Sequence, residues 1–131
     1  MVPLTALGVL QLVLLLEVKH FVCDGPLQTR TMVEEKSSYG QRLGLVHAGL
    51  HGVASLGLLG LLGIGWGLAG GLALAEAAIH YHIDFVKENV AKSAGLTVRD
   101  RTFWWLMAGD QALHHVTYLA MAAAVVLWTT P

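Results

Sequence analysis

Two apolar stretches joined by a short connection decide the fold. They are residues 43–64, LGLVHAGLHGVASLGLLGLLGI, and residues 68–86, LAGGLALAEAAIHYHIDFV, and Gly65–Gly67 joins them. A bilayer core needs about 20 predominantly apolar residues per helix. Each stretch therefore predicts a membrane-spanning helix, and the short connection predicts a tight hairpin between the two helices.

Composition extends this interpretation to the whole chain. Of the 131 residues, 55% are hydrophobic and 13% are charged, whereas a soluble domain has about 25% charged residues. Two more apolar stretches, at about residues 4–22 and 103–128, are long enough to span a bilayer. The predicted fold class is all-α, an integral membrane four-helix bundle that forms one domain over residues 1–131 in the lipid bilayer. The net charge of -1 argues against nucleic acid as a partner, and the single cysteine, Cys23, excludes an internal disulfide.

The basic residues predict the orientation of the helices, because short cytoplasmic loops of membrane proteins collect Lys and Arg. No Lys or Arg precedes Lys19, so the first stretch lacks the basic start of a signal peptide and is expected to be a retained helix. The basic residues all lie on one side of the predicted helices: Lys19, Arg30, Lys36, Arg42, Lys87, Lys92, Arg99 and Arg101. We therefore expect two cytoplasmic loops and both termini on the non-cytoplasmic side.

Ionisable residues inside the predicted helices are the candidate functional residues, because they are costly in lipid. Residues three or four apart share one face of a helix. This spacing joins Glu17 with His20 and then Asp24, His47 with His51, Glu76 with His80 and Asp84, and Asp110 with His114. His82 and His115 point away from these faces. All four sets reach the same cytoplasmic half of the bilayer, so we expect one shared site.

Imidazole and carboxylate groups on facing helices of a bundle are typical metal ligands. The predicted ligands are His20, His47, His51, His80, Asp84, Asp110 and His114, and either Glu17 or Glu76 would be the catalytic general base. Neutral imidazole with carboxylate suits a divalent metal, with zinc favoured over di-iron. The ligands exceed four, so the site predicts either two metal ions or one ion with a second layer of orienting residues.

Four functions remain open at this point, and the last of them, a proton or ion pathway, would require an oligomer, because four helices are few for one protomer. The leading one is metal-dependent hydrolysis of a lipid or phosphoester, in which the metal lowers the pKa of a bound water toward 7. The second is a non-catalytic accessory or scaffold subunit of a larger membrane complex or homo-oligomer, which the small size and short loops favour. The third is a haem-binding electron-transfer protein with histidines from two helices as axial ligands.

Two further expectations concern packing. A series of glycines predicts close approach between helices: Gly57, Gly60, Gly63, Gly67 and Gly71. The polar segment Glu34–Lys36 is expected to be a solvated loop.

The ordered motifs also carry a resemblance to a known family. They are Lys19-His20-Phe21 with Asp24 and Gln28, His47-Ala48 with His51, Glu76-Ala77-Ala78-Ile79-His80 with Asp84 and Lys87, and Asp110-Gln111 with His114. Over nearly the whole chain this resembles the DUF3307 family of small bacterial and phage membrane proteins of unknown function. The chain is more loosely similar to bacterial inner-membrane metal-dependent hydrolases. These resemblances imply a multi-pass protein of the bacterial inner (cytoplasmic) membrane, and they favour a hydrolase without naming a substrate.

Overall fold

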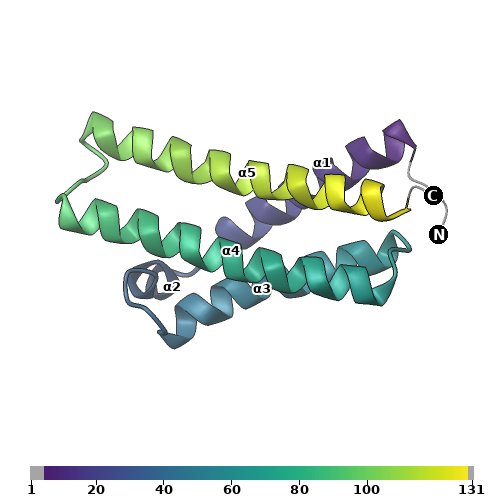
Figure 1. Ribbon diagram of the computed structural model, residues 1–131. Helices are drawn as coiled ribbons and strands as arrows, with labels where there is room; N and C mark the ends of the chain where they lie inside the picture. The colour runs from purple at the N-terminus through teal and green to yellow at the C-terminus, as the bar shows by residue number, and fades with distance from the viewer. Residues whose placement is uncertain (1–4, 130–131) are drawn as a thin grey trace.

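The structure, a computed structural model, describes residues 5–129, which form five helices and their connections (Figure 1). The helices are α1 Ala6–Asp24, α2 Arg30–Glu35, α3 Arg42–Leu61, α4 Trp66–Ser93 and α5 Arg101–Thr129. The predicted all-α class is confirmed over these residues. The start of the first predicted stretch, at Leu4, lies outside the described residues.

Helices α1, α3 and α5 are long and apolar enough to cross a membrane. Helix α4 is less apolar, because its middle holds Glu76, His80 and Asp84. At 1.5 Å per residue its 28 residues extend about 42 Å, which exceeds a bilayer core of about 30 Å. Residues 87–93, which were expected to form a loop, continue this helix, so the predicted end of the third helix at Val86 is wrong.

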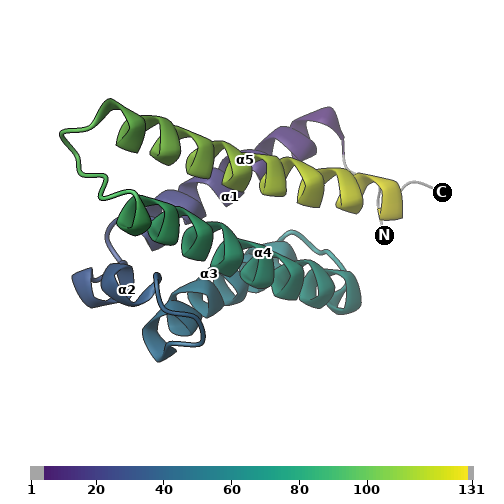
Figure 2. The ribbon, with the colours of Figure 1, turned by 60° about the vertical axis from the view of Figure 1, so that its left-hand side comes forward.

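The four long helices pack side by side, with α1 against α3 and α5, and α4 against α3 and α5. The short helix α2 packs against α3. Figures 1 and 2 place the start of α1, the α3–α4 turn and the end of α5 at one end of the molecule. Helix α2 and the α4–α5 connection lie at the other end. The segments that carry most of the basic residues therefore share one end.

A glycine sets the hairpin between α3 and α4. Gly63 has a φ of 77°, a left-handed conformation that glycine adopts without steric cost. The Ile64 N–H then donates to Leu59 O at 3.0 Å and the Gly63 N–H to Gly60 O at 3.0 Å, which closes the last turn of α3. The tight hairpin is confirmed, but its turn precedes Trp66, because Gly63 ends α3 earlier than expected.

The described helices are polar inside and apolar outside at the end that holds α2. Large apolar side chains face outward there, with Phe21 70%, Val86 56% and Trp105 67% exposed, and they also face outward at the opposite end, where Leu61 is 91% exposed. A soluble protein rarely exposes an apolar surface this extensive. At the other end the interior is apolar, formed by Leu12, Leu16, Leu59, Ile64, Ala69, Tyr118, Met121, Ala122 and Val125. An apolar exterior matches a lipid environment, so the fold supports a membrane protein.

The glycine series marks a close approach of α3 and α4 at Gly60, where a Cβ would lie 2.8 Å from the Trp66 ring, but not at most of its other positions. A Cβ at Gly57, Gly67 or Gly71 would meet nothing within 4 Å, so close packing is wrong for these three. The close contact between the backbones of α3 and α4 lies at Gly52, where a Cβ would be 3.0 Å from Ala73 O. The glycine series is regular in spacing, but spacing alone does not show which glycine faces α4. The backbone contact with α4 lies on the buried face of α3, which contains Gly52.

The expectation for the segment Glu34–Lys36 is also wrong. Glu34 and Glu35 end helix α2, and Lys36 is only 4% exposed. Lys36 Nζ lies 2.8 Å from Asp84 Oδ2 and also donates to Gln28 Oε1. Asp84 would otherwise be a buried carboxylate without a counter-charge, which is unfavourable in an apolar environment. This ion pair explains why a lysine that looks solvated in the sequence is buried.

Candidate metal centre

All seven predicted ligands lie in one polar cluster inside the helices, toward the end that holds α2. Helix α1 provides His20, α3 provides His47 and His51, α4 provides His80 and Asp84, and α5 provides Asp110 and His114. Each is at most 5% exposed. The expected helix phase of α4 is confirmed, because His80 is 1% exposed whereas His82 is exposed and contacts Ala78 O at 2.7 Å.

One group of donor atoms surrounds Asp24. His47 Nε2 and His51 Nε2 each lie 3.0 Å from Asp24 Oδ1, and His80 Nε2 lies 3.7 Å from it. The Nε2 atoms of His47 and His80 are 3.1 Å apart. One donor atom from each of the four residues lies within 4.8 Å of the others, so together they could hold a metal ion.

Asp24 was not among the predicted ligands. Hydropathy ended the first predicted stretch at Val22, which placed Asp24 in a loop, whereas α1 continues to Asp24. The spacing in the sequence already joins Asp24 to the helix face of His20, and following that spacing past the hydropathy boundary would have added Asp24 to the predicted ligands. His20 Nε2 in fact lies 3.2 Å from Asp24 Oδ2.

A second group consists of Asp84, Asp110 and His114 and shares no residue with the first. His114 Nε2 lies 3.7 Å from Asp110 Oδ1 and 3.9 Å from Asp84 Oδ1. Neither His114 Nε2 nor Asp110 Oδ1 has a hydrogen-bond partner among the described residues. Two donors at about 2.1 Å from one tetrahedral metal ion would lie about 3.4 Å apart. The observed separations are close to that value and too long for direct hydrogen bonds.

A third set, His20, His80 and His114, also meets the distance criterion but shares one residue with each of the other groups. It is therefore not an independent site. The rings of these histidines pack closely, with centroids 4.9 Å apart for His20 and His114 and 4.2 Å for His80 and His114. The same ring contacts join the two independent groups into one continuous cluster.

The cluster also contains two lysines that were not predicted from the sequence. Besides the Lys36–Asp84 pair, Lys19 is 7% exposed and forms an ion pair with Glu76. Lys19 Nζ also lies 3.2 Å from the Tyr118 hydroxyl and 3.4 Å from His51 Nδ1. In the sequence, Lys19 is one of the basic residues that predict the orientation of the helices. Its contacts in the structure show that it faces the interior.

The lysines leave the cluster short of positive charge. Its carboxylates are Asp24, Glu76, Asp84 and Asp110, and the lysines that form buried ion pairs with them, among residues 5–129, are Lys19 and Lys36. With neutral histidines, two negative charges remain to be balanced, and unpaired charge is strongly unfavourable in an apolar interior. A divalent cation would balance them, as would protonation of histidines.

Lys19 also fixes the protonation of one histidine. An ammonium group only donates hydrogen bonds, so His51 Nδ1 accepts and the proton of neutral His51 lies on Nε2. That Nε2–H points at Asp24 Oδ1. Both ring nitrogens of His51 therefore have hydrogen-bond partners, so His51 does not need a metal ion to explain its position. The remaining donors of the first group are Asp24, His47 and His80.

The two candidate general bases, Glu17 and Glu76, lie in different environments. Glu76 is 1% exposed and bound to Lys19 in the interior. Glu17 Oε2 accepts a hydrogen bond from His115 Nδ1 at 2.7 Å near the surface. Glu17 lines a polar opening of about 360 Å³ between α1 and α5, together with His20, Phe21, Asp24, Gly25, Gln111 and His115. Water could reach the first group of donors through this opening.

Comparison with known proteins confirms the resemblance seen in the sequence. Residues 11–131 match the family described as "Protein of unknown function (DUF3307)", and the chain belongs to this family. No curated protein and no solved structure matches the chain.

The Lys19–Glu76 pair provides a test of how the cluster is held. Lys19→Met should lower the free energy of unfolding in detergent by about 3–5 kcal/mol, because it leaves Glu76 buried without a counter-charge. The double variant Lys19→Met, Glu76→Leu should recover most of this loss, because it removes both charges. Lys92→Met, at an exposed lysine near the end of α4, is the matched control. A double variant as unstable as Lys19→Met would contradict a dominant role for this ion pair.

Proposed function

We propose that this protein is a membrane-embedded hydrolase with a two-metal centre, and that its substrate is a phosphoester. The observation that carries the proposal is the presence of two groups of three donors without a shared residue: Asp24, His47 and His80, and Asp84, Asp110 and His114. Catalytic zinc sites have three protein ligands and keep a further position open for water. We propose zinc as the metal, because sets of three imidazole and carboxylate donors match known catalytic zinc sites.

A metal in this cluster would supply a nucleophile at neutral pH, because it lowers the pKa of a bound water toward 7. In the reaction the water oxygen forms a bond to phosphorus, and the bond from phosphorus to the alcohol oxygen breaks. One proton of the water passes to a base and a proton returns to the departing alcohol. Asp24 and His20 lie where the polar opening reaches the cluster, which favours water entry there.

Glu17 is the better candidate for the general base. It lines the polar opening, and the partner of its carboxylate among the described residues is the exposed His115. Glu76 is held by Lys19, so its charge is already used to balance that ammonium group. We assign Glu76 a positioning role, because through Lys19 it influences the hydrogen bond to His51.

The haem-binding and accessory functions receive less support. In a haem protein with two axial histidines a porphyrin lies between the rings, whereas the His51 and His80 rings stack with centroids 3.6 Å apart. An accessory subunit does not by itself account for two negative charges in excess inside the cluster. Purified protein without bound metal would favour the accessory role.

We also propose that α4 crosses the membrane with α1, α3 and α5 as a four-helix bundle of the bacterial inner membrane. Its polar residues face the cluster, and its exposed positions include Leu74, Ile79 and Val86. The end that holds α2 and the α4–α5 connection would face the cytoplasm, because the basic loop residues are there. Both termini would then be non-cytoplasmic.

The metal centre predicts a contrast between two histidines of α4. His80→Ala should lower the zinc content from about two ions per chain toward one at a fixed free zinc concentration, because it removes a ligand of the first group and leaves Asp84, Asp110 and His114 in place. His82→Ala should leave occupancy unchanged, because His82 is exposed and outside both groups. Elemental analysis of detergent-purified protein measures both. The proposal fails if wild-type protein holds no transition metal, or if the two variants lose it equally.

The orientation predicts which loop an external reagent reaches. In a Cys23→Ala background, Ser38→Cys should be protected from an impermeant thiol reagent in spheroplasts, and Gly67→Cys should be labelled. Both positions are exposed, and a Cβ at Gly67 meets nothing within 4 Å. Labelling of position 38 with protection of position 67 would reverse the topology.

A further inference from the structure

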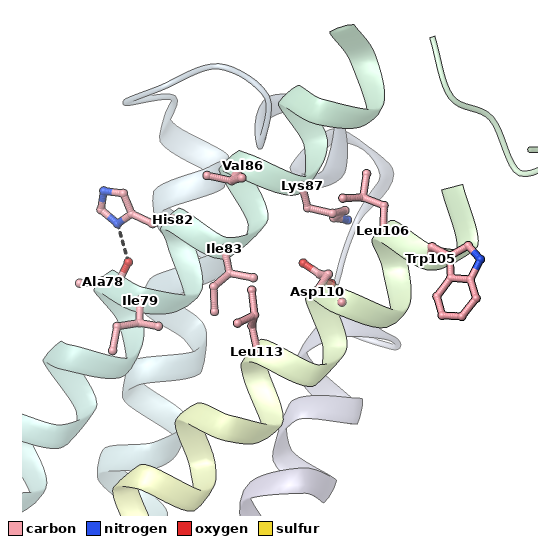
Figure 3. Close-up of a pocket in the computed structure, with 11 residues that line it drawn as sticks. Ala78, Ile79, His82, Ile83, Val86, Lys87, Trp105, Leu106, Asp110 and Leu113 are labelled. Atoms are coloured by element: carbon pink, nitrogen blue, oxygen red, sulfur yellow. Dashed lines mark hydrogen bonds between the residues drawn. The ribbon is translucent and has the colours of Figure 1, made fainter. Parts of the chain in front are cut away.

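An apolar groove runs between α4 and α5 on the outer surface of the helices (Figure 3). Its volume is about 830 Å³. Figure 3 shows Ile79 and Ile83 of α4 facing Leu113 of α5 across it, with Asp110 farther along the same wall as Leu113. The groove is distinct from the polar opening between α1 and α5, which leads to the other side of the cluster.

The position of the groove determines what can fill it. Helix α5 is apolar enough to span a membrane, and the lining residues Ile79, Val86 and Leu113 are 46%, 56% and 54% exposed. In a bilayer this surface meets lipid, and water in an apolar groove there would be unfavourable. The α5 wall from Trp105 to Leu113 rises about 12 Å. A groove of this length suits part of one hydrocarbon chain.

One end of the groove is polar. Lys87 and Asp110 both line it, and Asp110 belongs to the second group of donors. Lys87 Nζ lies 2.6 Å from Glu88 Oε1, its neighbour in the chain. A chain lying in the groove with its head toward the α4–α5 connection would bring that head to Lys87 and Asp110.

The charges at this end favour an anionic head group once a metal is bound. Without metal, Asp110 would repel a phosphate, whereas the charge of Asp84 is balanced by Lys36. A divalent ion held by Asp84, Asp110 and His114 would give this end a net positive charge, which together with the Lys87 ammonium group would attract a phosphate. Metal ions in phosphoester-cleaving centres bind the phosphate oxygens in the same way.

We propose that this groove binds one acyl chain of an anionic glycerophospholipid, and that it presents the phosphate to the metal group of Asp84, Asp110 and His114. The inference rests on the proposed hydrolase function and names its substrate class. The phospholipid approaches through the membrane along α4 and α5, while water arrives through the polar opening between α1 and α5. The two reactants thus reach the cluster from different sides.

A matched pair of glycine variants tests the groove. A Cβ at Gly109, in the groove, or at Gly71, on the exposed surface of α4, would meet nothing within 4 Å, so leucine fits at both positions. Gly109→Leu fills the groove and Gly71→Leu does not. The probe is phosphatidylglycerol in mixed detergent micelles, and native mass spectrometry counts the phospholipid bound per chain. Elemental analysis of the same samples gives the zinc content.

Wild-type protein and Gly71→Leu should each retain one phospholipid. Gly109→Leu should bind it about tenfold more weakly or worse, because each methylene displaced from an apolar site costs about fourfold in affinity. Zinc content should be equal in all three proteins. Lys87→Gln should weaken binding of phosphatidylglycerol in the zinc-loaded protein but not in protein treated with a chelator.

Other outcomes overturn the inference in different ways. Equal retention by Gly109→Leu and wild type would exclude the groove as the phospholipid site. Loss of an oligomer in Gly109→Leu by light scattering, with phospholipid retention unchanged, would assign the groove to a helix of a second copy. Groove-dependent retention by a protein that holds no zinc would refute the hydrolase and the substrate assignment together, while leaving phospholipid binding in place.

Discussion

The cost of placing charged groups in an apolar interior governs this structure. Each carboxylate that enters the helices needs a cation or a proton donor nearby, since an isolated charge there is strongly unfavourable. Lys36 folds inward to Asp84, and Lys19 turns inward to Glu76. Asp24 is surrounded by imidazole nitrogens from α3 and α4. The packing of α1, α3 and α4 at this end is thus set by the pairing of charges, whereas the opposite end has an ordinary apolar core.

The same constraint explains what the sequence reveals and what it hides. Helical spacing of polar residues inside apolar stretches identifies a buried face, so the sequence alone is enough to place His47, His51 and His80 together. It is not enough for Lys36, which lies in a polar segment, and it joins Asp24 to the face of His20 without showing that α1 continues as far as Asp24. Their burial depends on partners that are distant in the chain, such as Asp84 for Lys36.

Glycines illustrate a second limit of sequence reasoning. A regular glycine series suggests close helix packing, yet the backbone contact is at Gly52, where Ala73 and Ala77 of α4 approach. Which glycine faces a neighbour depends on how two helices are rotated against each other, and a single helix does not contain that information. Gly63 is different, because its effect is local and ends α3 through its own φ angle.

The polar cluster lies between a polar opening and an apolar groove, an arrangement that suits a reaction at the boundary between water and lipid. The polar opening is lined by Asp24, His20 and Glu17, and the apolar groove ends beside Asp110. Between them the two donor groups are connected by the packed rings of His80 and His114. A site with water on one side and hydrocarbon on the other can bring a lipid head group and a nucleophile together without exposing the charged interior to the membrane.

The most direct test of the metal centre is X-ray absorption at the zinc edge of zinc-loaded protein in detergent. A centre built from these two donor groups predicts nitrogen and oxygen ligands at about 2.0–2.2 Å, and no sulfur at about 2.3 Å although Cys23 is buried nearby. It also predicts zinc–zinc scattering at about 3.5–4 Å, as in two-metal sites. A sulfur ligand, or a spectrum of hydrated zinc alone at stoichiometric loading, would contradict it.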